Sequence, residues 1–129
     1  MAWPVVYYRA SDRSEPVNDE IDRLPPRAQV AIDNQIERLG LFGPNLGFPY
    51  TSQIEGELRE LRCHLGDDLY RILYRRSRNL FVLLHFIEKR TDKVPAEDIR
   101  IAQARWDEFV RRMNERPRRP PRAAGHDAP

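Results

Sequence analysis

The spacing between apolar residues changes partway along this chain, and this change constrains the fold more than any other feature. Before about residue 40 the apolar residues recur every three or four positions, which is the spacing of a helix with one buried face. Between about residues 60 and 75 they recur at every second position, which is typical of strands with one buried face. The sequence therefore predicts an α+β domain in which helices precede a group of strands.

Two amphipathic helices are expected near the start of the chain. Val17, Ile21 and Leu24 form the stripe of the first helix, which ends at Pro25-Pro26 because proline disrupts a helix interior. The second stripe consists of Ala28, Ile32, Ile36 and Leu39. We expect the two helices to form a hairpin. Residues 5–8, Val-Val-Tyr-Tyr, predict a preceding strand, and the Gly- and Pro-rich residues 40–56 predict a loop.

Three further strands are expected between residues 57 and 87. In the first two, polar residues alternate with a predicted core face made of Leu61, Cys63, Tyr70, Ile72 and Tyr74. The third, residues 80–87, is almost continuously apolar, which suits a central strand covered on both faces. Short polar turns between successive strands require antiparallel pairing, so these strands are predicted to form a meander.

A last helix and a tail complete the predicted organisation. Pro95 followed by Glu97 and Asp98 indicates a helix start, and the apolar stripe of this helix consists of Ile99, Ala102, Trp106, Phe109 and Met113. The predicted order is β-α-α-β-β-β-α, an antiparallel sheet packed against a helical hairpin and a C-terminal helix. Residues 1–116 are expected to form one domain, and the Pro- and Arg-rich residues 117–129 a disordered tail.

The composition excludes several classes of protein. The single cysteine, Cys63, excludes an internal disulfide framework. The start of the chain lacks a signal-peptide pattern, and the longest apolar run, residues 80–84, is too short to cross a bilayer. We therefore expect a cytoplasmic protein. The histidines and the cysteine lack the spacing of metal ligands, and no Gly-rich loop matches a nucleotide-binding pattern, so neither a metal nor a cofactor is expected.

Positive charge is concentrated in two parts of the chain. The net charge is only +2, yet residues 56–93 carry nine basic and six acidic side chains, and the last twenty residues carry six and two. Residues 1–55 carry five basic and eight acidic side chains. This placement fits a polyanionic partner, and it fits a solvated surface of mixed charge equally well.

Candidate site residues lie on the face of the meander opposite to the predicted core. Glu60, Arg62, His64 and Arg71 share this face, and Arg62 and Arg71 lie near one turn, where two guanidinium groups can hold one phosphate. The loop after the last strand adds Lys89, Arg90 and Lys93. Such a set suits metal-free cleavage of RNA, in which a 2′-hydroxyl attacks the adjacent phosphate and cations stabilise the developing charge.

The proton donor and acceptor for such a reaction remain open. The candidates are Glu60, His64, His85 and Tyr70. The alternative is structural: arginines on an exposed sheet face are usually solvated or ion-paired, and His85 falls in a buried strand.

Four segments, in this order, resemble the RelE/HigB superfamily and more closely its phage-derived HigB-like branch. They are Glu60-Leu61-Arg62, Leu69-Tyr70-Arg71-Ile72-Leu73-Tyr74, Val82-Leu83-Leu84-His85-Phe86 and Lys89-Arg90-Thr91-Asp92-Lys93-Val94-Pro95. The resemblance covers about residues 3–113. It implies a RelE-like fold and the toxin of a type II toxin–antitoxin system, an endoribonuclease that cuts mRNA in the ribosomal A site and inhibits translation. It also implies a helix-turn-helix antitoxin as partner.

The resemblance also assigns site residues. By position, Arg62, Arg71, Lys89 and Arg90 match the basic active-site residues of the superfamily, and Glu60 and Lys93 match further motif positions. Arg90 replaces the second lysine of the branch, and Val94 stands where the branch often has threonine. The predicted catalytic residues are Arg62, Arg71, Lys89, Arg90, Glu60 and His64, and the predicted RNA-binding residues are Lys93, Arg59, Arg75 and Tyr70. Two alternatives remain: a ParE-like toxin that binds DNA gyrase, and a non-catalytic binding module of the same fold.

Overall fold

The computed structural model describes residues 2–88 and 93–115. The predicted tail, residues 117–129, and the predicted site residues Lys89 and Arg90 lie outside these ranges. The elements, in chain order, are β1 (Val5–Tyr7), α1 (Pro16–Asp22), α2 (Pro26–Phe42), the 3-10 helix η1 (Gly43–Asn45), β2 (Thr51–Glu55), β3 (Leu58–Leu65), β4 (Asp68–Ser77), β5 (Leu80–Ile87) and α3 (Ala96–Met113).

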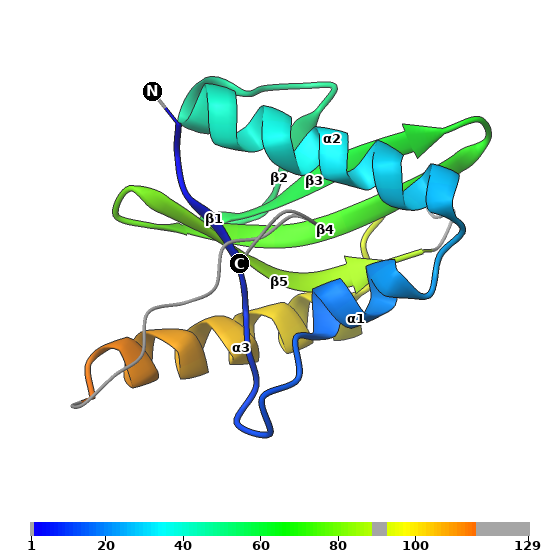
Figure 1. Cartoon of the computed structure of the whole chain (residues 1–129). Helices are drawn as coiled ribbons and strands as arrows, with labels where there is room; N and C mark the ends of the chain where they lie inside the picture. The colour runs from blue at the N-terminus through cyan, green and yellow to red at the C-terminus, as the bar shows by residue number, and fades with distance from the viewer. Residues whose placement is uncertain (1, 89–92, 116–129) are drawn as a thin grey trace.

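The strands form one sheet in the order β1-β5-β4-β3-β2. β1 pairs in parallel with β5, whereas the other neighbouring strands are antiparallel. Figure 1 shows α2 on one side of this sheet and α3 on the other. The predicted α+β architecture, with a helical hairpin and a C-terminal helix around a sheet, is therefore confirmed.

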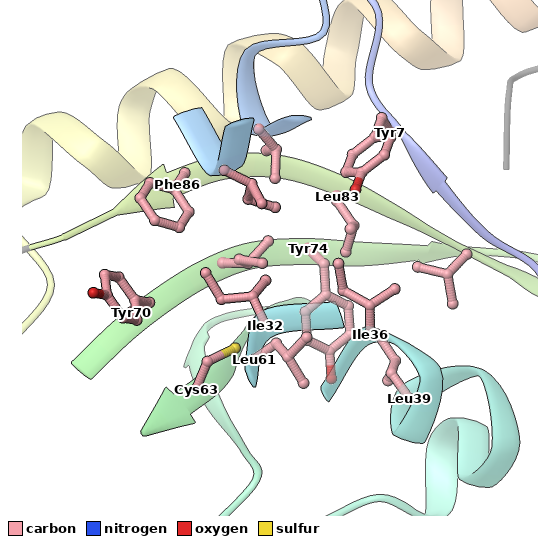
Figure 2. Packing of buried hydrophobic residues seen from close by; sticks show 14 of the residues in the cluster. Tyr7, Ile32, Ile36, Leu39, Leu61, Cys63, Tyr70, Tyr74, Leu83 and Phe86 are labelled. Carbon is pink, nitrogen blue, oxygen red and sulfur yellow. The ribbon is translucent and has the colours of Figure 1, made fainter. Parts of the chain in front are cut away.

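The core on the hairpin side matches the predicted stripes. All five residues of the predicted core face of the meander are at most 5% exposed. They pack with the stripe of α2, and Figure 2 shows Ile32, Ile36 and Leu39 beside Leu61 and Tyr74. Burial of these apolar side chains holds α1 and α2 against the sheet.

A second core lies between the sheet and α3. Trp106 and Phe109 of α3 pack there with residues of β5 and β4 that point away from the hairpin, among them Val82, Leu84 and Leu73. The strand β5 is thus covered on both faces, as its continuous apolar run predicts.

Among the described residues, no helix is both long enough and apolar enough to cross a membrane.

The prediction of a loop over residues 40–56 is wrong at both ends, because α2 continues to Phe42 and is followed by η1, and because the last part of the segment forms a strand. Residues Thr51–Glu55 form β2, which pairs with β3 at the edge of the sheet, so the sheet has one strand more than predicted. Only one residue of β2, Ile54, is apolar, and therefore no alternation signals the strand in the sequence. Its stability comes from pairing with β3 and from Thr51, whose buried hydroxyl donates to the Leu46 carbonyl at 2.6 Å.

An irregularity in β5 turns one polar side chain toward α3. Leu73 pairs with His85 and Tyr74 with Leu83, which leaves Leu84 as an extra residue on β5. Such a bulge interrupts the alternation of faces. Leu84 belongs to the core beneath α3, and His85, its neighbour, also contacts α3.

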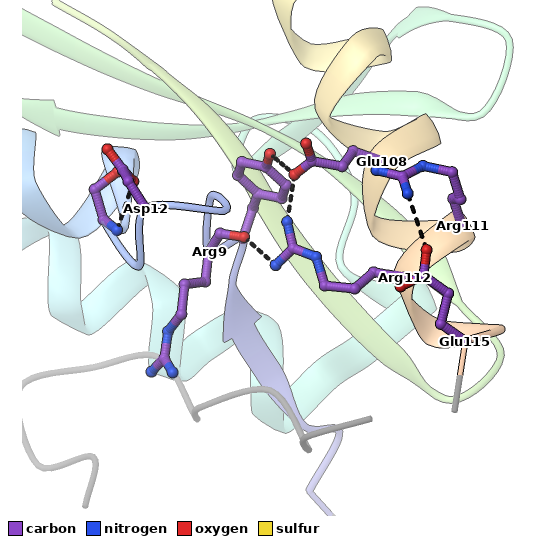
Figure 3. Close-up of polar contacts among 8 residues, drawn as sticks. Arg9, Asp12, Glu108, Arg111, Arg112 and Glu115 are labelled. Carbon is purple, nitrogen blue, oxygen red and sulfur yellow. Dashed lines mark hydrogen bonds and ion pairs between the residues drawn. The ribbon is translucent and has the colours of Figure 1, made fainter. Parts of the chain in front are cut away.

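The second half of α3 is fixed to the chain just after β1. Tyr8 donates a hydrogen bond to Glu108, and Arg112 pairs with Glu108 and donates to the Arg9 carbonyl (Figure 3). Burial, followed by the bond to Glu108, raises the pKa of Tyr8 to about 12, so its hydroxyl stays protonated at neutral pH. These contacts set the position of α3 over the sheet.

Candidate active site

The strand register brings three of the predicted site residues together. Arg62 on β3 lies directly opposite Arg71 on β4, and Glu60 lies two positions before Arg62 on the same face. This is the face that α3 packs on, because Leu58 and Leu73, which share the alternation of Glu60 and Arg71, belong to the core beneath α3. Ser52 of the unpredicted strand β2 lies opposite Glu60 and completes the group.

Glu60 is the centre of this group. One carboxylate oxygen lies 2.7 Å from Nε of Arg71, and the other accepts hydrogen bonds from Nη1 of Arg62 at 3.1 Å and from the Ser52 hydroxyl at 2.6 Å. Glu60 is only 2% exposed, and a carboxylate is stable at such a site when its charge is paired. Since both oxygens are engaged, the geometry suits Glu60 to orienting the two guanidinium groups.

The two arginines differ in their access to solvent. The side chain of Arg71 is 3% exposed, whereas that of Arg62 is 20% exposed. A guanidinium group has five donors in one plane, and among the contacts of the described residues Arg62 uses one of them on Glu60. Arg62 is therefore the arginine of this group that can reach a phosphate from outside the protein.

Two more predicted residues lie in exposed positions on or near this face. His64 follows Arg62 by two positions on β3 and is exposed. Lys93 is exposed just before Val94, which is buried in the core beneath α3. Lys89 and Arg90 lie outside the described residues; they follow Ile87, which pairs with Arg71 at the end of β5.

Three of the predicted RNA-binding residues do not join this group. Arg59 and Tyr70 belong to the opposite face: Arg59 donates to the Thr51 hydroxyl at 3.0 Å, and Tyr70 stacks on Phe86 with ring centroids 6.0 Å apart. Arg75 is on the α3 face, but its guanidinium lies over Trp106 at 4.3 Å and pairs with Glu57.

His85 lies apart from this group and connects β5 to α3. Its Nε2 is 2.7 Å from a carboxylate oxygen of Asp98, and its Nδ1 is 3.1 Å from Nη1 of Arg105, which also donates to the Leu84 carbonyl. With a carboxylate as acceptor, Nε2 carries the proton and Nδ1 accepts from Arg105. Burial lowers the pKa of His85 despite the opposing effect of Asp98. Both ring nitrogens are thus engaged, which fits a structural role.

Two other features, a pocket and the cysteine, lie outside the group around Glu60. A pocket of about 420 Å³ lies beside His85 and is lined by residues of α1, β5 and α3. Cys63 is fully buried in the hairpin-side core, and burial raises the pKa of its thiol, so the thiol stays protonated.

Sequence reasoning missed Ser52 because residues 51–55, with one apolar residue, carry no strand pattern. It also missed Phe48, which lies between η1 and β2 beside Arg62, with 6.0 Å between the ring centroid and Cζ. The sequence signal that could have identified Phe48 is the occurrence of aromatic residues in a Gly- and Pro-rich segment.

Comparison with known proteins extends this description. A family model described as "Phage derived protein Gp49-like (DUF891)" matches residues 19–107, a range that includes Ser52, Glu60, Arg62 and Arg71. No curated protein matches the chain. The family belongs to the RelE/HigB-like toxin superfamily, is associated with toxin–antitoxin systems and with toxin ribonuclease activity, and implies an antitoxin partner. The chain therefore belongs to the Gp49-like family of phage-derived proteins, a family of toxins of toxin–antitoxin systems.

Proposed function

We propose that this protein is a HigB-like toxin that cleaves mRNA on the ribosome without a metal ion and thereby inhibits translation. The observation that carries the proposal is the arrangement of Arg62 and Arg71 around Glu60, which holds one guanidinium at the edge of solvent. Membership of a toxin family supports the same function.

In the proposed reaction, the substrate's own 2′-hydroxyl is the nucleophile. It loses its proton, its oxygen bonds to the adjacent phosphorus, and the bond from phosphorus to the 5′-oxygen breaks. The 5′-oxygen takes up a proton, which leaves a 2′,3′-cyclic phosphate and a 5′-hydroxyl. Negative charge grows on the non-bridging oxygens, and guanidinium donors fixed beside them lower the barrier.

Arg62 is the proposed phosphate ligand. Glu60 holds its Nη1, and the buried Arg71 in turn pairs with the other oxygen of Glu60. Glu60 and Arg71 therefore keep the guanidinium of Arg62 in one orientation, which reduces the reorganisation needed in the transition state. His64, exposed on the same face, is the proposed proton carrier. Lys89, Arg90 and Lys93 are proposed to add positive charge.

We propose ribosome dependence for a physical reason. The carboxylate at the centre of this group is ion-paired with Arg71 and accepts hydrogen bonds from Arg62 and Ser52, so its proposed role is to hold the two guanidinium groups and not to act as an activated base. A partner that aligns the 2′-hydroxyl with the phosphate contributes a large part of the barrier reduction by positioning alone. The ribosomal A site is that proposed partner. The antitoxin is proposed to be a helix-turn-helix protein with an acidic surface that covers Arg62.

Induced expression tests the proposal. Wild type and Arg62→Ala are expressed in bacteria, and growth and primer extension on cellular mRNA are followed. Arg100→Ala is the matched control, because Arg100 is exposed on α3 and pairs only locally with Glu97 among the described residues. Growth arrest with codon-phased cuts in wild type and control, both absent in Arg62→Ala, is expected. Arrest by Arg62→Ala without cut mRNA would exclude the nuclease and point to a target such as gyrase.

A further inference from the structure

Phe48 is an exposed aromatic residue beside the candidate active site. The residue is 78% exposed, more than any other large apolar residue in the described part of the chain. It lies in the segment between η1 and β2, and its ring is the neighbour of Arg62. An exposed phenylalanine is not unusual in itself, so what distinguishes Phe48 is its place beside Arg62.

The backbone around Phe48 is held in place by hydrogen bonds. The amides of Tyr50 and Thr51 both donate to the Gly47 carbonyl, at 3.0 and 3.1 Å, and the buried Thr51 hydroxyl donates to Leu46. In addition, the Arg62 amide donates to the Tyr50 carbonyl at 2.8 Å, which attaches the segment to β3. The exposed ring therefore projects from a fixed turn, and binding to it costs little conformational entropy.

Each of the two aromatic residues in this segment, Phe48 and Tyr50, has a guanidinium group beside its ring, which favours an anionic, planar ligand. The guanidinium of Arg62 lies 6.0 Å from the Phe48 ring centroid, and that of Arg38 lies 4.3 Å from the centroid of Tyr50, two residues further along. Proteins that bind single-stranded nucleic acids combine these two elements, since cations follow the phosphates while bases stack on aromatic rings. In a single strand every phosphate lies next to a nucleobase, and the planar face of that base can stack on an aromatic ring.

We infer that Phe48 is a stacking platform for a nucleobase of single-stranded RNA whose phosphate is bound by Arg62. The inference rests on the proposed function and adds a subsite to it. Stacking on phenylalanine depends on the ring face, so this subsite accepts bases of more than one kind. The platform also fixes the strand next to the reacting phosphate, which makes Phe48 a positioning residue.

Binding of a non-cleavable ligand tests the inference. The probe is a short single-stranded oligonucleotide of mixed sequence with 2′-O-methyl riboses, which cannot undergo 2′-hydroxyl attack, and its fluorescence anisotropy is measured at several salt concentrations. Phe48→Leu keeps apolar surface but removes the ring, and Phe48→Trp keeps a ring. The matched control is Phe42→Leu, because Phe42 is also exposed, at 55%, but lies at the end of α2. Thermal melting checks that each variant is folded.

Phe48→Leu is expected to weaken binding by about 5- to 150-fold, the range for loss of one base–aromatic stack. Its salt dependence should stay that of the wild type, because no phosphate contact is lost. Arg62→Ala should instead reduce the salt slope by about one. Phe48→Trp and Phe42→Leu should bind like the wild type.

Three results would overturn the inference, and they are distinguishable. Wild-type affinity in Phe48→Leu, with weakened binding in Arg62→Ala, would leave RNA binding intact and show that Phe48 does not contribute to it. Equal losses in Phe48→Leu and Phe48→Trp would show that the aromatic ring is not what the ligand needs. A wild-type protein that does not bind the probe would overturn the inference of a stacking subsite for single-stranded RNA, whereas the proposed function is tested separately by induced expression and primer extension.

Discussion

Replacing Arg71 by methionine removes one charge from the buried group around Glu60. Removing one partner of a buried ion pair typically destabilises a protein by about 3–5 kcal/mol, because the other charge stays buried without compensation. Here Glu60 keeps Arg62 at 3.1 Å and Ser52 at 2.6 Å, so we expect the lower end, about 3 kcal/mol. For a domain of this size that corresponds to a melting temperature lower by about 10 °C.

A double-mutant cycle separates the pair from its surroundings. Wild type, Arg71→Met, Glu60→Leu and the double variant are compared by urea denaturation followed by circular dichroism. The double variant places two apolar side chains where the buried pair was, and such replacements are often neutral. Arg62, whose side chain is 20% exposed, can then be solvated. The double variant should therefore lie within about 1 kcal/mol of the wild type.

Two outcomes would refute this reasoning. If Arg71→Met loses less than about 1 kcal/mol, Glu60 does not depend on its contact with Arg71. If the two single losses simply add in the double variant, the side chains are not energetically coupled despite the 2.7 Å between them. Either result would also remove the argument that Arg71 positions Arg62 through Glu60.

Three further predictions concern stability. The folded-state pKa of His85 lies below its usual value of 6.5, so the unfolded state binds more protons at this residue, and stability should fall as the pH drops below about 6.5. In His85→Gln the urea midpoint should depend less on pH. An unchanged pH dependence of the midpoint would contradict this prediction. Gly43 has a φ of 57°, and a Cβ added there would lie 2.7 Å from Cε2 of Trp3. Gly43→Ala should therefore lower the free energy of unfolding, measured by urea denaturation, by at least about 2 kcal/mol. The control Gly47→Ala has open space around the added Cβ and should be near neutral. Tyr8→Phe loses the bond to Glu108 and should cost about 1 kcal/mol by thermal melting, and an unchanged melting temperature would show that this bond does not hold α3.

Much of the fold follows from local patterns that the sequence carries. The stripe of α2 and the alternation from Leu61 to Tyr74 identify the hairpin-side core because burial on one face is periodic along the chain. The strand β2 escapes this reasoning, since an edge strand with one apolar residue is stabilised by pairing with β3. The bulge at Leu84 is equally invisible, because it depends on how β4 and β5 align.

The candidate site was predictable as a set of residues on one face, but not as a network. Alternation places Glu60, Arg62 and Arg71 together, and the structure agrees. The pairing of Glu60 with both arginines, and the burial of Arg71, require the distances between side chains. Ser52 depends on the missed strand. Positive charge does not reveal that Arg59 contacts Thr51 on the opposite face of the sheet, or that Arg75 lies over the ring of Trp106.

The pairing of β3 with β4 has a consequence for how this protein can change during evolution. One residue inserted into or deleted from the turn at Gly66 would shift the register by one position, and every side chain of β4 would exchange faces. Arg71 would then point into the hairpin-side core, and the residue opposite Arg62 would be Tyr70 after an insertion or Ile72 after a deletion. Loss of the site and loss of the core would occur together, so the length of this turn should tolerate far less variation than that of other surface turns.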